Sequence, residues 1–327
     1  MSTVLELGLP AVHPQPAVAP SVIDAGDTVE IWEVAARDGL QAEKTRLTAD
    51  TKVELIERLA AAGAPVIEAG SFVRADRVPQ MADSAEVFQR TQHLDVRLPV
   101  LVPNLRGYEM ARAAGADDIA VFLSVTESFS QQNLGASRAV MEASVAGVVE
   151  RALADGVRVR GYLSMVFGDP WEGAVAVADV VRLATLMQSW GITALSLGDT
   201  NGVATPGHVR TVVRALTDAG VPTSHLALHM HDTYGQALAN VYAGLEEGVR
   251  IFDAAAGGVG GCPFAKSATG NLATDDLVFM LNGLGVRTGI DLNALTETSA
   301  WLSQQLGKPP TSRVATALTR SERNGIG

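Results

Sequence analysis

Two histidines separated by a single residue are the clearest candidates for chemistry in this sequence. His229 and His231 lie in the run 228–236, and Asp232 follows them directly. In an extended strand, residues two apart point to the same face, so the two imidazoles would lie side by side. A histidine pair capping a surface strand is the simpler alternative. The adjacent Asp232 and a glycine-rich segment about 30 residues later favour a metal site.

A second reactive pair, Arg37 and Asp38, follows the first apolar run of the chain and precedes Gly39. An adjacent arginine and aspartate often form only a local salt bridge, with the glycine making the turn. Beside a metal site, the same pair would supply a carboxylate ligand and a fixed cation. A planar, permanently charged guanidinium is well suited to stabilising a developing oxyanion.

Together these segments offer a mixed set of oxygen and nitrogen donors for a cation. Such a set suits six-coordinate Mg²⁺ or Mn²⁺ with positions left for substrate oxygens, although other divalent ions could also bind. A closed structural zinc site would instead favour several cysteines. The predicted ligands are Asp38, His229, His231 and the amide oxygen of Asn271.

The glycine-rich segment 256–264 contains Cys262, the only cysteine of the chain. Such a segment can cradle a phosphate, or it can form a flap whose glycines permit hinge motion. In phosphate-binding loops the last glycine is followed directly by Lys-Ser or Lys-Thr, and segment 256–264 has no such ending, since the nearby Lys266-Ser267 follows Ala265. The flap interpretation is therefore favoured, with the thiol delivered to the substrate as an acid or base. A small buried hydrophobic residue is the alternative role of a lone cysteine.

These dispersed residues need a scaffold that brings them together. Short apolar runs predict strands at 29–35, 64–69, 96–102, 118–123, 157–166, 193–197, 226–231 and 250–255. Amphipathic stretches between them predict helices at about 48–62, 79–91, 105–115, 133–155, 173–190, 206–219, 236–247 and 270–283. Eight strand–helix units predict an α/β fold of the TIM-barrel type, with its active site at the carboxyl ends of the strands. A doubly wound sheet is disfavoured, because no GxGxxG follows the first strand.

Polar side chains recur at the carboxyl end of one predicted strand after another. Glu68 lies at the end of the second strand and Ser71 follows it, Ser164 lies near the end of the fifth, and Asn201 follows the sixth. This clustering favours a barrel whose mouth binds a substrate. The predicted substrate-binding residues are Gln41, Ser71, Tyr162, Ser164, Thr200 and Asn201.

The bulk composition excludes several other classes of function. The chain has 327 residues, 47% hydrophobic, and a net charge of −11, which argues against nucleic acid as a partner. No apolar run is long enough to cross a membrane. Residues 1–27 contain no lysine or arginine, which argues against targeting segments, and a single cysteine suits a reducing compartment. We expect a cytoplasmic protein with a Pro/Ala-rich tail at 1–27 and one catalytic domain at 28–327 that ends in a helical extension.

Several motifs, in order and at similar spacing, resemble those of 3-hydroxy-3-methylglutaryl-CoA lyases, which are metal-dependent TIM-barrel enzymes of the DRE-TIM metallolyase type. The sequence RDG is shared with isopropylmalate, homocitrate and citramalate synthases. The GGCP loop and the run HDTYGQALAN are more specific to the lyases. The matching segments are 37–44, 66–73, 229–240, 260–263 and 270–274.

The resemblance implies a role for each matching residue. It implies metal ligation by the four ligands named above, and enolate stabilisation by Arg37. Cys262 and His229 would act as acid and base, and Glu68 would organise the metal shell and the arginine. The implied reaction is the divalent-metal-dependent retro-Claisen cleavage of 3-hydroxy-3-methylglutaryl-CoA to acetyl-CoA and acetoacetate. A homo-oligomer, by analogy a dimer, is also implied.

The sequence departs from the family pattern at the fifth and sixth strands. The run 162–171 replaces cysteines and smaller residues, and Asn201 stands where an aliphatic residue is commoner. Asp275 and Phe264 replace a usual glutamate and tyrosine. The first two changes leave the 3-substituent of the substrate open. The same lyase chemistry on citramalyl-CoA or a longer-chain 3-hydroxyglutaryl-CoA is therefore an alternative. Two further alternatives concern the class of protein: a Claisen-condensing acyltransferase and a catalytically silent scaffold.

Overall fold

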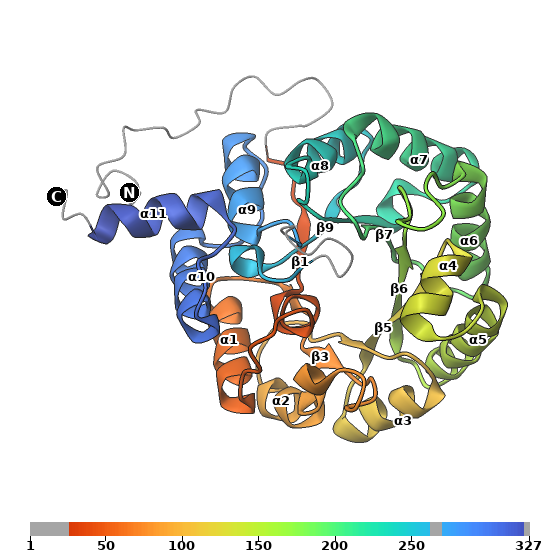
Figure 1. Ribbon diagram of the computed structural model, residues 1–327, viewed down its shortest axis with the longest axis horizontal. Coiled ribbons are helices and arrows are strands. Elements are labelled where there is room, and N and C mark those ends of the chain that lie inside the picture. Colours follow the sequence, from red (N-terminus) through yellow and green to blue (C-terminus); the bar gives the residue numbers. More distant parts are fainter. Residues whose placement is uncertain (1–25, 262–269, 324–327) are drawn as a thin grey trace.

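The computed structural model describes residues 26–261 and 270–323, which form a ring of parallel strands surrounded by helices (Figure 1). The sheet has nine strands in the order β2-β1-β9-β8-β7-β6-β5-β4-β3. The (βα)8 TIM barrel predicted from the sequence is confirmed. The strands are β1 (Glu30–Glu33), β2 (Val66–Ile67), β3 (Gly70–Ser71), β4 (Val100–Leu101), β5 (Asp118–Ser124), β6 (Arg158–Ser164), β7 (Leu195–Asp199), β8 (Leu226–Met230) and β9 (Ile251–Ala254).

The barrel closes across its second strand, which is broken into β2 and β3. Between the two pieces, Glu68 N donates to Glu33 O at 2.9 Å on the side of β1. The next residue, Ala69, donates from N to Pro99 O at 2.9 Å on the other side. The eight expected strands are thus all present, with the second one kinked where Glu68 enters the barrel.

Within the expected strand at 96–102, only Val100–Leu101 form a continuous strand, and Arg97 forms an isolated parallel bridge with Val66. Pro99 and Pro103 flank these two residues. Because proline lacks a backbone N–H, it cannot donate to a sheet ladder. The two prolines therefore confine β4 to a short central segment.

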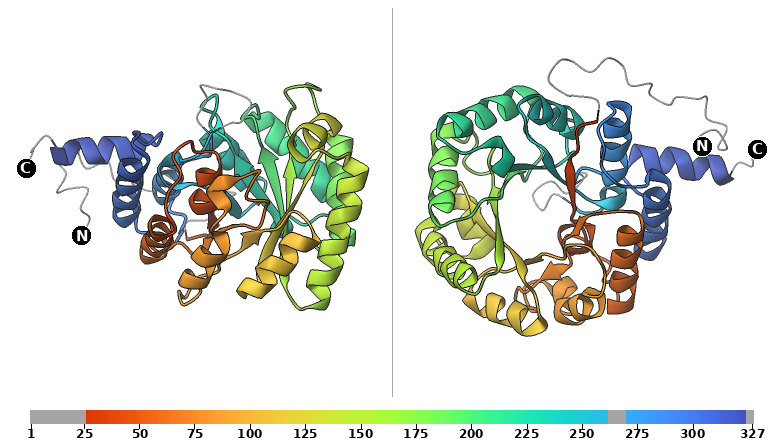
Figure 2. Two further views of the ribbon diagram at one scale, coloured as in Figure 1. Left: turned by 60° about the horizontal axis from the view of Figure 1, so that its bottom comes forward. Right: turned by 180° about the vertical axis from the view of Figure 1, so that it is seen from behind.

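Helices cover the outside of the barrel (Figure 2). Parallel strands covered on both faces are apolar, and every residue of β7 and β8 is buried. The α-helices are α1 (Ala49–Ala61), α2 (Ser84–Thr91), α3 (Leu105–Ala114), α4 (Glu127–Phe129), α5 (Arg138–Ala154), α6 (Val177–Ser189), α7 (Pro206–Asp218), α8 (Ala237–Glu246), α9 (Thr274–Gly283), α10 (Leu292–Leu306) and α11 (Arg313–Arg323).

The last two helices form the expected extension outside the ring (Figures 1 and 2). α10 packs against α1, and α11 packs against α9 and α10. Within the described residues, no helix is both long enough and apolar enough to span a membrane.

Several helices begin a few residues later than the sequence predicted, and α5 shows why. It was expected from residue 133 but starts at Arg138, after α4 and a π-helical turn, η3 (Ser130–Leu134). Gly135 then adopts a left-handed conformation with φ of 72°, which interrupts the helix. Ser137 starts it again, because its side chain accepts a hydrogen bond from Val140 N.

Candidate metal and substrate site

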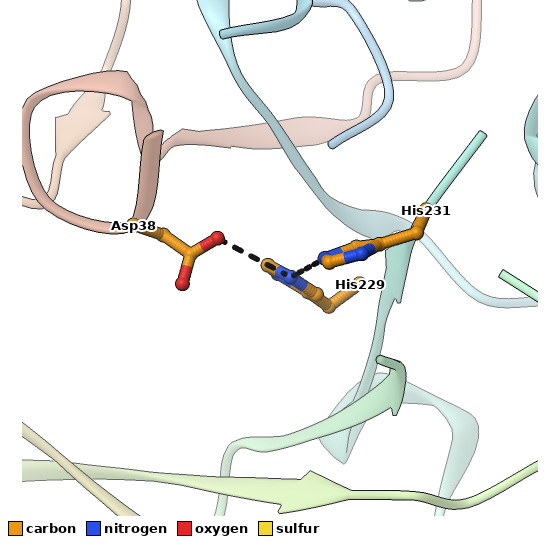
Figure 3. A group of neighbouring side chains, drawn as sticks. All are labelled: Asp38, His229 and His231. Atoms are coloured by element: carbon orange, nitrogen blue, oxygen red, sulfur yellow. Dashed lines mark hydrogen bonds and ion pairs between the residues drawn. The ribbon is translucent and has the colours of Figure 1, made fainter. Parts of the chain in front are cut away.

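Three side chains from two segments that are far apart in the sequence, Asp38, His229 and His231, lie side by side (Figure 3). Asp38 lies in a π-helical turn, η1 (Ala35–Gly39), directly after β1, whereas His229 lies on β8 and His231 just beyond it. One ligand atom from each lies within 4.8 Å of the others. His229 Nε2 is 3.2 Å from His231 Nε2 and 3.9 Å from Asp38 Oδ2.

The chemistry of this cluster fits a divalent cation. Two imidazole nitrogens face each other across 3.2 Å, an arrangement in which only one can hold a proton. A carboxylate and two imidazoles are donors that Mg²⁺, Mn²⁺ and related ions accept. The cluster is therefore a candidate site for a divalent metal ion.

The electrostatic surroundings keep Asp38 ionised and His231 neutral, which are the forms that bind a cation. Burial acts to raise the pKa of Asp38, but Arg37 and the two imidazoles outweigh it and hold the pKa well below its usual range. Burial, together with His229, lowers the pKa of His231 to about 4. Burial also acts to lower the pKa of His229, yet its hydrogen bond to Asp253 and the charge of Asp38 raise it. In the metal-free protein, His229 therefore retains a proton more readily than His231.

Asn271, the fourth predicted ligand, lies beside this cluster. It forms an isolated antiparallel bridge with His231. Its amide nitrogen donates to Asp38 Oδ2 at 2.9 Å and to Val259 O at 3.2 Å. Both partners are acceptors, which identifies that end of the amide as the nitrogen. Ligation by the amide oxygen stays a prediction.

Arg37 is held between two carboxylates. Its Nε and Nη2 each lie 2.7 Å from Glu68 Oε2, and its Nη1 lies 2.7 Å from Asp38 Oδ1. The guanidinium also lies over the Tyr162 ring, 5.5 Å from its centroid. Burial raises the pKa of Glu68, and the charge of Arg37 only partly offsets that effect. The arginine is fixed in one orientation beside the predicted ligands.

A close backbone contact positions the turn that carries Arg37 and Asp38. A Cβ at Gly39 would lie 2.5 Å from Val259 Cγ1 and 3.1 Å from Val259 O. Only glycine therefore lets η1 pack against the beginning of the glycine-rich segment. The same Val259 carbonyl accepts from Asn271, so this contact links η1 to the fourth predicted ligand.

A cavity of about 260 Å³ opens onto the cluster. Four of the predicted substrate-binding residues line it together with Arg37 and the three converging side chains, namely Gln41, Tyr162, Ser164 and Thr200. Apolar side chains complete the wall: Leu101, Phe122, Phe129 and Leu163. The cavity is large enough for a small acyl group and presents both a cation site and a guanidinium to it.

The structure does not bring the other two predicted substrate-binding residues into this cavity. Ser71 is buried, and its backbone N donates to Ser84 Oγ at 3.1 Å. Asn201 lines a second cavity of about 390 Å³, together with Val166 and Phe167. The departures near the fifth and sixth strands are thus divided, because Tyr162 and Ser164 line the first cavity whereas Val166, Phe167 and Asn201 line the second, mainly apolar one.

Cys262 and Phe264 lie outside the described residues, so the predicted thiol role stays a prediction. The base of the loop that carries them is described. It begins with a short 3-10 turn, η5 (Ala256–Gly258), in which Gly257 N donates to Asp275 Oδ2 at 2.7 Å. Ala256 N donates to Glu33 Oε1 at 3.0 Å. Two buried carboxylates therefore anchor the start of the loop.

The sequence interpretation missed a buried group behind His229. Asp253 on β9 accepts from Ser196 Oγ at 2.8 Å and from Arg160 Nη2 at 2.5 Å. Its Oδ2 also lies 3.2 Å from His229 Nδ1. The signal in the sequence was an aspartate between Phe252 and Ala254 in the predicted strand 250–255, because a buried carboxylate demands hydrogen-bonding partners.

The fold is a TIM barrel, and its mouth carries a carboxylate, two histidines and a fixed arginine. These features place the chain in the class of TIM-barrel enzymes with a metal site. Comparison with known proteins narrows that class. The HMGL-like family model matches residues 28–302, and the chain belongs to that family.

The chain resembles proteins of this family over most of its length. It is 47% identical to the mitochondrial hydroxymethylglutaryl-CoA lyase of Mus musculus over 290 residues, 88% of this chain and 89% of that protein. It is 46% identical to a 3-hydroxy-3-isohexenylglutaryl-CoA/hydroxy-methylglutaryl-CoA lyase of Pseudomonas aeruginosa over 291 residues, 89% of this chain and 97% of that protein.

Solved structures of hydroxymethylglutaryl-CoA lyases also resemble this chain. A hydroxymethylglutaryl-CoA lyase from Pseudomonas aeruginosa superposes with a TM-score of 0.88 at 44% identity, covering 91% of this chain and 99% of that one. An HMG-CoA lyase from Acinetobacter baumannii, in complex with coenzyme A and 3-methylmalate, gives a TM-score of 0.85 at 38% identity, covering 90% and 96%.

Proposed function

We propose that this chain is a carbon–carbon lyase that cleaves 3-hydroxy-3-methylglutaryl-CoA to acetyl-CoA and acetoacetate with a bound Mg²⁺ or Mn²⁺. The observation that carries the proposal is the convergence of Asp38, His229 and His231 within 4.8 Å beside a fixed arginine. Relatives named as lyases of this substrate, at 46–47% identity, support it. The complex of coenzyme A with a related lyase supports an acyl-CoA partner.

Different residues of the cavity serve different parts of the proposed reaction. When bound, the cation would polarise substrate oxygens and lower the pKa of the tertiary hydroxyl. Arg37 places a permanent positive charge where the thioester enolate forms, as its contacts with Glu68 and Asp38 prevent it from turning away. Tyr162 and Phe122 line the cavity and limit the water around the reacting atoms.

The two roles predicted for His229 compete for one atom. Its Nδ1 faces Asp253, so only Nε2 is directed towards the cavity side. A nitrogen that ligates a cation has no lone pair left for a proton. We therefore assign His229 to cation binding, and leave proton transfer with the predicted Cys262.

A second candidate is the same cleavage of an acyl-CoA with a longer 3-substituent. The Pseudomonas relative whose name includes a 3-hydroxy-3-isohexenylglutaryl-CoA activity favours it. We place the longer 3-substituent in the separate, mainly apolar cavity of about 390 Å³ beside Asn201, Val166 and Phe167. Release of acetyl-CoA from this substrate would follow the same steps.

The test is acetyl-CoA release, measured with Mg²⁺ and with EDTA, from three substrates in parallel: 3-hydroxy-3-methylglutaryl-CoA, its isohexenyl analogue and citramalyl-CoA. We expect metal-dependent cleavage of the first substrate at ordinary enzymic rates. Cleavage of the isohexenyl analogue alone would move the function to the second candidate. Equal release in EDTA, or release from none of the three, would contradict the proposal.

We also propose a cytoplasmic location and a homo-oligomer, which rest on the single cysteine and on the family resemblance. Cell fractionation tests the first, and light scattering after size-exclusion chromatography tests the second. Recovery with a membrane-enclosed compartment, or a monomeric mass, would contradict them.

A further inference from the structure

A buried carboxylate lies directly behind the imidazole of His229. Asp253 is on β9, adjacent to β8 in the sheet, and its Cα pairs with that of His229. Its Oδ2 lies 3.2 Å from His229 Nδ1. The opposite edge of the same ring presents Nε2 to His231 and Asp38. The imidazole is therefore held between this carboxylate and the candidate cation site.

Two further side chains fix the orientation of Asp253. Arg160 Nη2 donates to its Oδ1 at 2.5 Å, and Ser196 Oγ donates to its Oδ2 at 2.8 Å. Arg160 is 2% exposed and lies over the Trp32 ring, 3.8 Å from its centroid. Because stacking and an ion pair hold the arginine, the carboxylate cannot rotate without leaving a buried charge unpaired.

This arrangement determines where His229 carries its proton. An ionised carboxylate only accepts hydrogen bonds, so His229 Nδ1 must donate to Asp253. The neutral ring then has its lone pair on Nε2, the nitrogen that faces the cation site. His231 has no comparable support, since its buried Nδ1 lacks a hydrogen-bonding partner among the described residues. The two predicted histidine ligands are thus supported unequally.

We propose that Asp253 is a positioning residue that fixes His229 with its proton on Nδ1, and that Arg160 and Ser196 hold Asp253 in place for this purpose. A carboxylate or carbonyl that accepts from the distal nitrogen of a histidine ligand sets the tautomer and raises the basicity of the ligand. The inference deepens the proposed function and rests on it for the metal. The proton position itself requires no metal.

The variant Asp253→Asn tests the inference with almost no change in shape. Arg160 requires an acceptor, and a hydrogen bond to a charged group is stronger than a neutral one, so the amide oxygen faces Arg160. The amide NH₂ then faces His229 Nδ1, which must accept. The proton moves to Nε2 and blocks the ligand atom. We expect Mn²⁺ affinity, measured by calorimetric titration, to fall about 10–100-fold.

A matched control is Asp118→Asn. Asp118 is also a buried aspartate paired with arginines, Arg97 and Arg158, but it starts β5 and so lies at the opposite end of the barrel. We expect this variant to lose stability while it keeps the Mn²⁺ affinity of the wild type. Mn²⁺ binding by Asp253→Asn within threefold of wild type would overturn the inference.

A second measurement needs no variant and no metal. Nitrogen-15 NMR of the wild-type protein, at a pH above the titration of His229, reports which ring nitrogen carries the proton. A protonated Nδ1 supports the inference, and a protonated Nε2 overturns it even if Asp253→Asn fails to fold. Wild-type protein that binds neither Mn²⁺ nor Mg²⁺ would contradict the proposed function, whereas the NMR result would still decide the proton position.

Discussion

At the scale of single residues, two carboxylates together fix the orientation of the Arg37 guanidinium. Glu68 accepts from two of its nitrogens and Asp38 from a third. A planar guanidinium can make these contacts together, whereas an ammonium is a point charge with no fixed fork. The position of the positive charge, and not only its presence, is therefore built into this site.

The substitution Arg37→Lys keeps the charge and removes the fork. We expect kcat to fall about 10²–10³-fold, as for loss of one oxyanion-stabilising donor, with a smaller change in KM. Steady-state assays of acetyl-CoA release measure both constants. Arg214→Lys, in an exposed ion pair with Glu247, is the control and should behave as wild type. A kcat for Arg37→Lys within threefold of wild type would remove Arg37 from the proposed chemistry.

At the scale of elements, buried acids fasten the turn η5 to the barrel. Glu33 accepts from two backbone N–H groups, of Ala35 and Ala256, and from Thr274 Oγ1 at 2.6 Å. Asp275 accepts from Gly257 N and from Ser299 Oγ. Burial raises the pKa of Glu33 and of Asp275 to about 7 each. The anchorage of this turn is consequently sensitive to pH near neutrality.

The sign of that sensitivity follows from the direction of the shift. Because the folded-state pKa of Asp275 lies above its unfolded value of 3.8, its contribution to stability is complete below about 4. That contribution is lost as the pH rises through about 7. Between pH 4 and 7, the folded state binds the proton that the unfolded state has released. The protein should therefore become less stable over this window.

The variant Asp275→Asn isolates this effect, since an amide does not titrate. We expect its melting temperature to fall less than that of wild type between pH 5 and pH 8, by roughly 2–4 °C for each kcal/mol removed. Differential scanning calorimetry in EDTA measures both profiles without interference from metal binding. Parallel profiles for the two proteins would show that Asp275 does not titrate in this range.

At the scale of the whole molecule, the site exists only when the barrel is closed. Asp38 and Asn271 are 233 residues apart in the chain, yet their side chains are hydrogen-bonded. Asp38 follows the first strand, whereas the histidines lie on and after β8. A cation that binds these groups binds only the folded state, so its binding energy adds to the stability of the whole barrel.

Mn²⁺ should therefore raise the melting temperature relative to EDTA. At a hundredfold excess over its Kd, a single-site ligand adds about 2.7 kcal/mol to the free energy of unfolding, which predicts a shift of several degrees. His231→Ala should lose the shift, together with metal-dependent activity. His208→Ala, an exposed histidine on α7, should keep it. An unchanged shift in His231→Ala would exclude His231 as a ligand.

The sequence by itself determined the barrel and most of the residues at its mouth. Alternation of apolar runs and amphipathic stretches is a local property, and it identifies strands and helices before any contact forms. The two-residue spacing of His229 and His231 likewise places both rings on one face of a strand. Polar residues at successive strand ends then converge because parallel strands share one carboxyl edge.

Only the tertiary structure decided which of these side chains meet. Thr200 and Asn201 are neighbours in the turn after β7, yet they line different cavities, and nothing in the local sequence pattern separates them. The role of Asp253 depends on the register between β8 and β9, which aligns it with His229. Local periodicity encodes the face on which a residue lies, whereas register and barrel closure select its partner across the chain.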